Sequence, residues 1–285
     1  MSRSPNIIIL GASSLIARWL VKRLTQTGFN GQCFSRKQIH IDKADTFTWN
    51  PLDKTLPINL IPESIVVSLL PLWLLPLLLP QLHDCQQLIV FSTTSIFSKK
   101  DSPNPEERKL VNLIQTAEKT IIQTATVKKI PWTILRPTLI YDGRYDQNIT
   151  AIAKFIQRWK ILPVASPANG LRQPVHADDV AAAVVSAIKN PASYNRSFNI
   201  GGGEILTYRQ MVQRVFQAME KPVTILPLPP KAILATCWLL NNLTSAGPNA
   251  AMFQRMNQDL AYDFTNARQD LNYKPRPFQP DFHIG

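Results

Sequence analysis

The sequence predicts an α/β protein with a doubly wound parallel sheet and a small C-terminal α/β lobe. Short β-branched runs alternate with segments of helical periodicity, as in residues 7–10 followed by residues 15–24. The connections between these segments are short, as in sheets whose parallel strands are joined by helices. The 285 residues are 45% apolar and 18% charged, a composition that can form a large core.

The remaining elements follow from the same periodicities. The further strands expected in the sheet are residues 32–35, 46–49, 65–69, 88–92 and 132–136. Helices are expected at residues 107–124, 149–159, 178–188 and 207–219, with short strands at 197–200 and 223–226. We therefore expect a main domain at residues 1–145, with its sheet completed by residues 173–203, and a lobe formed mainly by residues 146–285.

Two apolar segments raise the question of a membrane. Residues 64–82 carry no charge and are long enough to span a bilayer. However, Pro71, Pro76 and Pro80 interrupt them, and each proline costs a helix interior about 3 kcal/mol. We expect a buried strand and a broken helix there, with no transmembrane span. Residues 232–240, which include Trp238, are expected to form an internal helix of the lobe; the alternative is a peripheral contact with a membrane face or a protein.

Charge and cysteine content limit the partners. Lys and Arg number 31 against 19 Asp and Glu, and the net charge of +12 favours an anionic partner. No long basic run or zinc-finger spacing is present, so we expect no nucleic acid and no metal. Cys33, Cys85 and Cys237 lack the paired spacing of a disulfide framework. The apolar run at the N-terminus is too short for a signal peptide, so the expected location is cytoplasmic.

A phosphate-binding turn is predicted at residues 11–17, which read GASSLIA. Gly11 permits a tight turn after the first strand, and the N-terminus of the following helix offers free N–H groups to a pyrophosphate. Ser14 and Ala17 replace two glycines of the usual G-x-x-G-x-x-G spacing. The alternative is an ordinary strand–turn–helix. The cofactor contacts expected on this side of the sheet come from Gly11, Ser13, Ser14, Leu15, Ile16, Leu70 and Pro71.

Basic residues end the second predicted strand, at Ser35-Arg36-Lys37. Proteins that bind NAD place an acidic residue near this point to hold the 2′-hydroxyl of the ribose. A basic residue suits a 2′-phosphate instead, and arginine is the better bidentate partner. We therefore expect NADP, held by Arg36, with NAD or a solvated surface pair as the alternatives.

A family resemblance rests on several strings in order. TILRPTLIY at 133–141 resembles the LRPTxxYG stretch of extended short-chain dehydrogenases, the NAD-dependent epimerase/dehydratase family. VFSTTSIF at 90–97, AE at 117–118, RQPVHADDV at 172–180, NIGG at 199–202 and DLNYKP at 270–275 extend the resemblance almost from end to end. The nearest subgroup is a set of nucleoside-diphosphate-sugar epimerase-like bacterial proteins. A Rossmann fold is what this resemblance implies.

The resemblance also implies roles for particular residues. Pro137 would lie against the nicotinamide, and Thr93 would hydrogen-bond the reacting oxygen. A small anionic substrate, a nucleotide sugar by analogy, would be held by Asn148, Arg172 and Arg255. A homodimer would form through the helix at 107–124.

The sequence departs from the family where its chemistry resides. The family uses a Tyr-x-x-x-Lys pair, and counting back from Glu118 places Leu110 and Ile114 at those positions. Neither exchanges a proton, and a positioned acid or base contributes about 10²- to 10⁴-fold in rate. The replacement groups that the sequence offers are Lys99, Lys100, Tyr141, Asp146 and His176, of which Lys99 and Tyr141 join Thr93 as the predicted catalytic set.

Two functions therefore stand side by side. One is an epimerase/dehydratase- or reductase-like enzyme that transfers a hydride without the usual pair. The other is a catalytically silent dinucleotide-binding protein that serves as a sensor or an assembly partner, a reading that Leu110 and Ile114 favour.

Overall fold

Seven parallel strands form the centre of the molecule. The structure is a computed structural model that describes residues 5–37, 46–52, 63–82, 85–229, 232–233 and 250–282. The strands follow the order β11-β6-β5-β4-β1-β2-β3 and pair in parallel throughout. Their bounds are β1 (Asn6–Leu10), β2 (Asn30–Ser35), β3 (Phe47–Pro51), β4 (Ser64–Ser68), β5 (Cys85–Phe91), β6 (Trp132–Pro137) and β11 (Arg196–Ile200). The predicted α/β class with a Rossmann-type sheet is confirmed.

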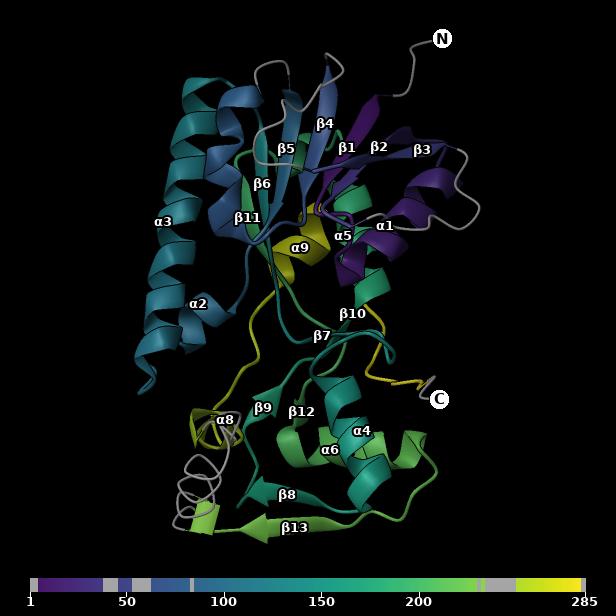
Figure 1. Ribbon diagram of the computed structural model, residues 1–285, viewed down its shortest axis with the longest axis vertical. Helices are drawn as coiled ribbons and strands as arrows, with labels where there is room; N and C mark the ends of the chain where they lie inside the picture. The colour runs from purple at the N-terminus through teal and green to yellow at the C-terminus, as the bar shows by residue number, and fades with distance from the viewer. Residues whose placement is uncertain are drawn as a thin grey trace.

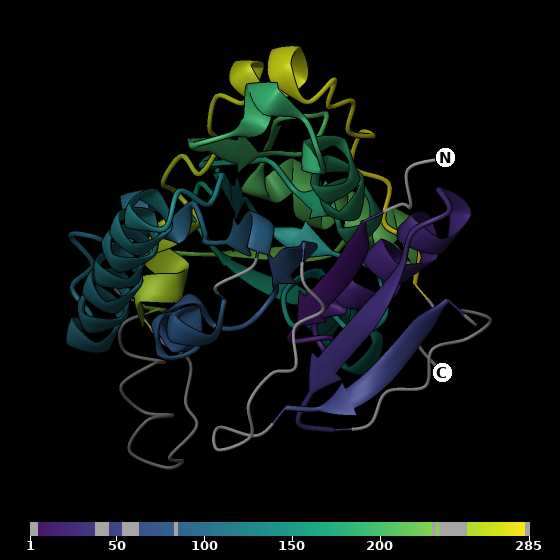
Figure 2. The same ribbon diagram turned by 90° about the horizontal axis from the view of Figure 1, so that it is seen from above.

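Helices cover both faces of this sheet (Figures 1 and 2). On one face lie α1 (Leu15–Gln26) and α5 (Ala177–Ala187), which pack on each other and on Ile7 and Ile9 of β1. On the other face lie α3 (Pro105–Val127) and the 3₁₀ helix η1 (Leu72–Leu77), which pack against Ile8 and Leu10. Successive residues of β1 thus enter opposite cores, which explains why the strand reads as one continuous apolar run.

The proline-rich apolar segment forms a strand and short helices. After β4 the chain continues as η1, with Pro76 inside it, and then as η2 (Leu79–Gln81). Proline has no backbone N–H to donate, and a short 3₁₀ helix tolerates this loss better than the interior of a long α-helix does. The expectation of a buried strand with a broken helix is confirmed. Among the described residues, no helix is long and apolar enough to cross a membrane.

The lobe has its own small core. It contains α4 (Ile149–Trp159), β8 (Leu162–Ala165), α6 (Tyr208–Ala218), β13 (Ile225–Leu228) and α8 (Ala250–Arg255), and it lies below the sheet in Figure 1. Thr207 caps α6 through a reciprocal capping box with Gln210. The predicted strand at 223–226 is displaced by two residues. Residues 232–240 lie outside the described part of the chain except for 232–233.

The remaining described elements are short. They are α2 (Ser95–Ser98), β7 (Ile140–Tyr141) paired with β10 (Val175–His176), β9 (Leu171–Arg172) paired with β12 (Leu206–Thr207), η3 (Pro191–Ser193) and α9 (Thr265–Asp270). The two-residue strands were not predicted, because two residues carry no detectable periodicity.

We expect the core under α3 to dominate the stability of the sheet. Ile121 is fully buried, whereas Leu113 on the same helix is 46% exposed. Ile121→Ala should lower the free energy of unfolding by about 2–5 kcal/mol, because it removes buried methyl groups and leaves a cavity. Leu113→Ala, as the matched control, should cost less than about 1 kcal/mol. Urea denaturation measures both, and equal losses would contradict this packing.

Candidate functional site

Gly11 occupies a position that only glycine fits. Its φ of +83° is left-handed, and its N–H donates to the carbonyl of Phe34 over 2.8 Å. A Cβ at this position would lie 2.9 Å from the main chain of Leu69 and Leu70. The turn therefore brings together the carboxyl ends of β1, β2 and β4, the edge at which open α/β sheets bind ligands.

The first helix begins directly from this turn. Ser14 is the N-cap of α1, and its Oγ accepts a hydrogen bond from the N–H of Ala17 at 3.3 Å. Ser13 is exposed at the tip of the turn, Leu15 is half-buried and Ile16 is buried. The capping hydrogen bond thus explains why a serine occupies position 14. A contact between the Ser14 hydroxyl and a phosphate stays a prediction.

Arg36 lies exposed just after β2. The preceding strand reaches the turn, because the carbonyl of Phe34 accepts from both Gly11 and Ala12. Within the described part of the chain, no hydrogen bond or ion pair holds the Arg36 guanidinium. It is thus a free cation at the strand end where a 2′-phosphate is expected.

Two buried hydroxyls at the same edge lack partners among the described residues. They are Ser68, the last residue of β4, and Ser92, which follows β5. Buried polar groups are normally hydrogen-bonded, so each marks a place that a polar ligand group could complete. The sequence gave no signal for either, since a serine at a strand end is common.

A hydrogen bond from Thr94 to Pro137 brings the segment that contains Thr93 close to the end of β6. Thr93 Oγ1 accepts from the N–H of Ser95, the first residue of α2, at 3.1 Å, and the N–H of Thr94 donates to the carbonyl of Pro137 at 3.2 Å. Leu70 is half-buried and Pro71 is exposed, and both follow β4 at this edge. The predicted cofactor residues therefore gather along one edge of the sheet.

The positions of the family's catalytic pair are apolar and point differently. Ile114 is 6% exposed and belongs to the core between α3 and the sheet, whereas Leu110 is 38% exposed. Neither side chain carries a titratable group.

Lys99 and Arg255, predicted for separate roles, meet on one carboxylate. Lys99 Nζ lies 3.2 Å from Glu107 Oε1, and Arg255 Nη1 lies 2.6 Å from Glu107 Oε2. Burial alone would raise the pKa of Glu107, but hydrogen bonds from Ser102 and Lys99 hold that pKa below its ordinary value. The charged Glu107 therefore ties the start of α3 to α8. Sequence reasoning missed it, since glutamates in a first helical turn are common.

A cavity of about 410 Å³ opens between the sheet domain and the lobe beside these groups. Its lining comes from α2 and the α2–α3 connection on one side and from α8 with the following segment on the other. The residues are Phe97, Ser98, Asp101, Ser102, Pro103, Ala251, Gln254, Arg255, Gln258, Asp259, Leu260 and Tyr262. Of the predicted substrate residues, only Arg255 lines it; Asn148 is exposed at the start of α4.

Arg172, predicted to hold a substrate phosphate, lies among main-chain carbonyls. It is 5% exposed, and its guanidinium donates to the carbonyls of Leu171 and Gln258 at 2.8 Å and of Arg255 at 2.5 Å. Its burial lowers its pKa to about 10. Both terminal nitrogens are thus bound to main-chain oxygens, so Arg172 holds the segment around α8 in place.

Tyr141, predicted as a catalytic residue, is packed in the interior. It is 1% exposed and makes edge-to-face contacts with His176 and Phe278. Burial raises its pKa to about 12, and its hydroxyl accepts from the N–H of Gln279 at 3.4 Å. A tyrosine packed in this way joins the sheet domain to the lobe, and it is poorly suited to exchange a proton.

The other titratable candidates organise loops. His176 Nδ1 accepts from the N–H of Asp178 and caps α5, and burial lowers its pKa. Asp146 is buried, and its oxygens accept from four backbone N–H groups and from the Thr150 hydroxyl. Lys100 is exposed.

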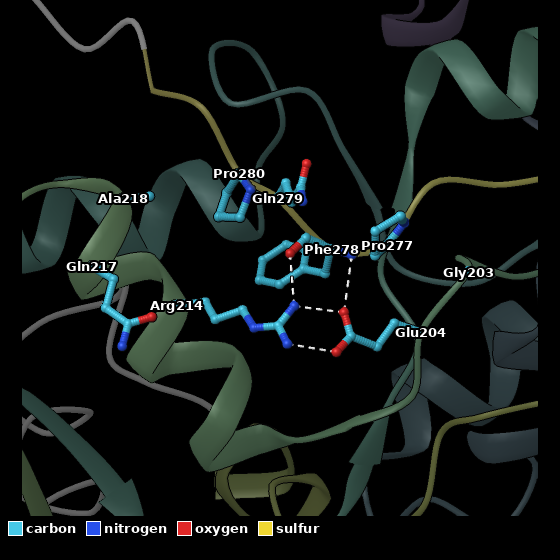
Figure 3. A pocket seen from close by; sticks show the side chains of 9 residues that line it. All are labelled: Gly203, Glu204, Arg214, Gln217, Ala218, Pro277, Phe278, Gln279 and Pro280. Carbon is cyan, nitrogen blue, oxygen red and sulfur yellow. Dashed lines mark hydrogen bonds and ion pairs between the residues drawn. The ribbon is translucent and has the colours of Figure 1, made fainter.

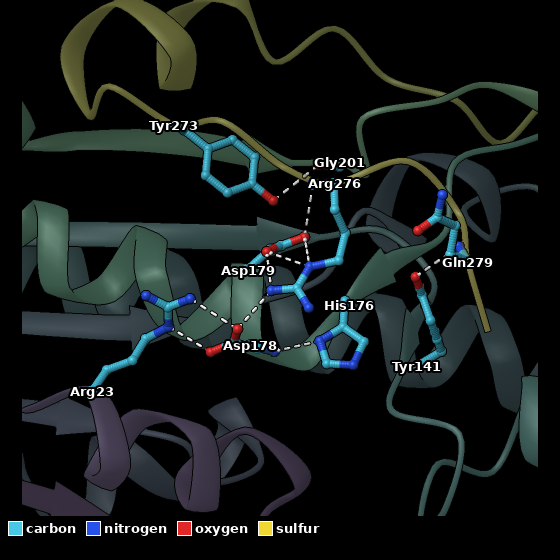
Figure 4. Close-up of polar contacts among 9 residues, drawn as sticks. All are labelled: Arg23, Tyr141, His176, Asp178, Asp179, Gly201, Tyr273, Arg276 and Gln279. Atoms are coloured by element: carbon cyan, nitrogen blue, oxygen red, sulfur yellow. Dashed lines mark hydrogen bonds and ion pairs between the residues drawn. The ribbon is translucent and has the colours of Figure 1, made fainter. Parts of the chain in front are cut away.

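An ion-pair network joins α1, α5 and the C-terminal segment (Figure 4). Arg23 of α1 donates to Asp178 at 2.5 and 2.8 Å, and Arg276 pairs with both Asp178 and Asp179. A separate open cavity of about 590 Å³ lies where the same segment meets α6, with Arg214 bound to Glu204 and to the carbonyl of Phe278 (Figure 3). None of the predicted site residues lines that cavity.

The sheet order, the glycine turn and the helix that begins beside it together define a Rossmann-type α/β fold. Residues 74–201, less than half of the chain, match the family described as NAD dependent epimerase/dehydratase family. This match supports the family resemblance carried by the motifs.

Known proteins similar to the chain agree with this assignment. UDP-glucose 4-epimerase of Vibrio cholerae is 22% identical over 63% of this chain and 52% of its own length. Subunit 9 of the NADH dehydrogenase (ubiquinone) 1 alpha subcomplex of Arabidopsis thaliana is 26% identical over 34% of this chain and 24% of its own. The chain thus spans about half the length, or less, of these curated relatives.

Among solved structures, the fold is shared closely. The UDP-glucuronic acid 4-epimerase from Bacillus cereus, in complex with UDP-glucuronic acid and NAD, has a TM-score of 0.70 at 16% identity and covers 96% of this chain and 95% of its own. At this identity the likeness establishes the fold alone.

The ion-pair network predicts a pH dependence of stability. Burial by itself would raise the pKa of Asp178, but the hydrogen bonds from Arg23 and Arg276 place it below its ordinary value. Asp178→Asn should lower the free energy of unfolding by about 1–3 kcal/mol at neutral pH. A lowered pKa in the folded state means that this contribution is present above about pH 4 and is lost as the pH falls through the folded pKa.

Urea titrations of wild type and variant from neutral to acidic pH measure this difference. Glu220→Gln, which changes an exposed carboxylate, is the control and should have little effect at any pH. A difference between wild type and Asp178→Asn that grows as the pH falls would refute the assignment.

Proposed function

We propose that the protein binds NADP(H) across the Gly11 turn, with the 2′-phosphate on Arg36. One observation carries the proposal: Arg36 is an exposed cation, without a partner among the described residues, at the strand end beside a turn that only glycine permits. Phosphate groups bind at such helix N-termini, and arginine matches phosphate oxygens in bidentate geometry. NAD is the alternative, in which Arg36 makes no specific contact.

The residues at this edge fit the rest of the dinucleotide. The absent side chain at Gly11 permits close approach of a pyrophosphate, and Ser13, Leu15 and Ile16 supply the first amides of the turn and of α1. The unpartnered hydroxyls of Ser68 and Ser92 offer hydrogen bonds. Pro137 gives the nicotinamide a surface at the end of β6. When bound, the cofactor supplies a hydride donor or acceptor.

For the chemistry, we propose hydride transfer on an anionic, nucleotide-sugar-like substrate in the 410 Å³ cavity between the sheet domain and the lobe. The nucleotide-sugar epimerases among the similar proteins support this substrate class. Arg255 lines the cavity and would meet the substrate anion, and Arg172 would act by fixing the main chain of Arg255.

Thr93 would hydrogen-bond the reacting oxygen, because it lies directly before the N-cap of α2, whose residues Phe97 and Ser98 line this cavity. Lys99 is the predicted titratable group that lies beside it. A homodimer through α3 and a cytoplasmic location, where the buried thiols of Cys33 and Cys85 would stay reduced, complete the proposal.

A second candidate is a catalytically silent dinucleotide-binding protein that serves as a sensor or an assembly partner. The observation that favours it is the pair Leu110 and Ile114, one half-exposed and the other in the core, at the positions where the family has its proton-transferring residues. The similarity to a subunit of NADH dehydrogenase gives the same reading some support, since that protein is named as part of an assembly.

Titration with NADPH and NADH, followed by nicotinamide fluorescence at fixed salt, tests the cofactor proposal. Arg36→Ala should weaken NADPH about tenfold or more, because it removes a charge-assisted contact, and should leave NADH within about twofold. Lys109→Ala, an exposed lysine on α3, is the matched control and should change neither. Equal weakening of both nucleotides by Arg36→Ala would remove Arg36 from this role.

Turnover separates the two candidates. With NADPH saturating, an active enzyme should convert at least one member of a nucleotide-sugar panel, and Thr93→Val should lower kcat about tenfold or more without changing the Kd for NADPH. Thr116→Val, on the exposed face of α3, should leave kcat unchanged. Tight NADPH binding with no turnover of any panel member would favour the silent protein.

A further inference from the structure

The outer face of α4 carries two solvent-exposed aromatic side chains. Phe155 is 39% exposed and Trp159 is 59% exposed, and their ring centroids lie 6.4 Å apart, one helical turn from each other. The opposite face of α4 is fully buried through Ile149, Ala153 and Ile156. The lobe core is therefore complete without the aromatic pair, which faces solvent.

A basic stripe runs beside the aromatic pair. Lys154, Arg158 and Lys160 are exposed, and no ion pair holds any of them within the described part of the chain. The Arg158 guanidinium lies 5.2 Å from the centre of the Trp159 ring. The sequence contains no acidic residue between Asp146 and Asp178, so no neighbour in this stretch compensates the three charges.

The same surface continues onto the chain that enters β13. The N–H of Leu162 donates to the carbonyl of Thr224 at 3.0 Å, so Ile161 and Val223 lie on the neighbouring chain segments that enter β8 and β13. These two apolar side chains are 39% and 46% exposed. Lys221 adds a further exposed cation, and Glu220 is the one acidic neighbour along this stretch. β8 and β13 form the end of the molecule that lies opposite the central sheet (Figure 1).

We propose that this surface, the lobe tip formed by Lys154, Phe155, Arg158, Trp159, Lys160, Ile161, Lys221 and Val223, docks on an anionic lipid bilayer. Indole and phenyl rings bind at the headgroup level of a bilayer, and lysine and arginine are attracted to its anionic phosphates. A helix with an exposed aromatic stripe flanked by cations lies in the plane of such an interface.

The composition favours lipid over a protein partner. Lysine is depleted in the buried part of protein–protein interfaces, whereas this surface carries three exposed lysines around its aromatic centre. A bilayer accepts those charges at its headgroups without an ordered partner for each. The strands β8 and β13 of the lobe tip lie at the opposite end of the molecule from β1 and α1 (Figure 1), so this inference does not depend on the proposed cofactor or reaction.

Co-sedimentation of the full chain with vesicles tests the proposal. Binding is expected to phosphatidylcholine vesicles that contain phosphatidylglycerol and not to pure phosphatidylcholine. It should weaken strongly between about 0.1 M and 1 M salt, where the Debye length falls from about 10 to 3 Å. The triple variant Lys154→Glu/Arg158→Glu/Lys160→Glu should lower partitioning by on the order of 100-fold or more, since each basic residue contributes about 1 kcal/mol.

A matched variant controls for overall charge. Lys109→Glu/Lys119→Glu/Lys129→Glu changes three exposed lysines on α3 and just after it, and should retain most of the binding. Trp159→Phe and Phe155→Ala/Trp159→Ala separate the aromatic contribution, with about tenfold weaker partitioning expected for the double variant. Thermal melts followed by circular dichroism verify that each variant is folded.

Fluorescence gives an independent readout. The chain has six tryptophans, and a blue shift on addition of anionic vesicles that disappears in Trp159→Phe would place this side chain in the interface. The proposal is overturned if the wild type does not bind anionic vesicles, or if both triple variants lose binding equally. It is also overturned if the aromatic variants abolish self-association while vesicle binding is absent, because the lobe tip would then contact a second copy.

Discussion

The close approach of three strand ends at Gly11 is the constraint on which the cofactor side of the molecule depends. The carbonyl of Phe34 accepts from two successive N–H groups of the turn, and the main chain of Leu69 and Leu70 fills the space of a side chain. Because the turn is this tight, α1 starts directly at the sheet edge with its N-terminal amides toward the crevice. The same geometry brings Arg36 and the unpartnered Ser68 to that edge.

Arg172 and Arg255, which the family resemblance predicts to bind the substrate, contact other groups of the protein in this structure. Glu107 lies between Lys99 and Arg255 and joins the sheet domain to α8, while Arg172 is buried among main-chain carbonyls. Breaking a buried or half-buried ion pair leaves one charge poorly solvated, so these contacts stabilise the relative position of lobe and sheet. A substrate anion in the cavity would compete with Glu107 for Arg255, and its affinity would reflect that competition.

The helix that carries the family's catalytic pair is retained here as a structural element. Ile114 fills the core under α3, and Leu110 lies half-exposed one turn earlier. Tyr141 and His176, which looked like replacements, pack against each other and cap α5. Any proton transfer would therefore come from the segment around Thr93 and Lys99 or from the lobe, and α3 would contribute only support.

Local patterns in the sequence predicted the main elements, the glycine turn and the apolar residues Leu110 and Ile114 where the family's catalytic pair is expected. Hydrophobic periodicity located β1, α1 and α4 within a few residues, because burial on one or both faces of an element imposes a period on neighbouring residues. Only the tertiary structure decided the roles of Arg172, Glu107 and Tyr141. Each of the three has a partner 83 or more residues away along the chain, and no local period records such a contact. The two-residue strands likewise depend on tertiary structure, because each pairs with a segment that is distant along the chain.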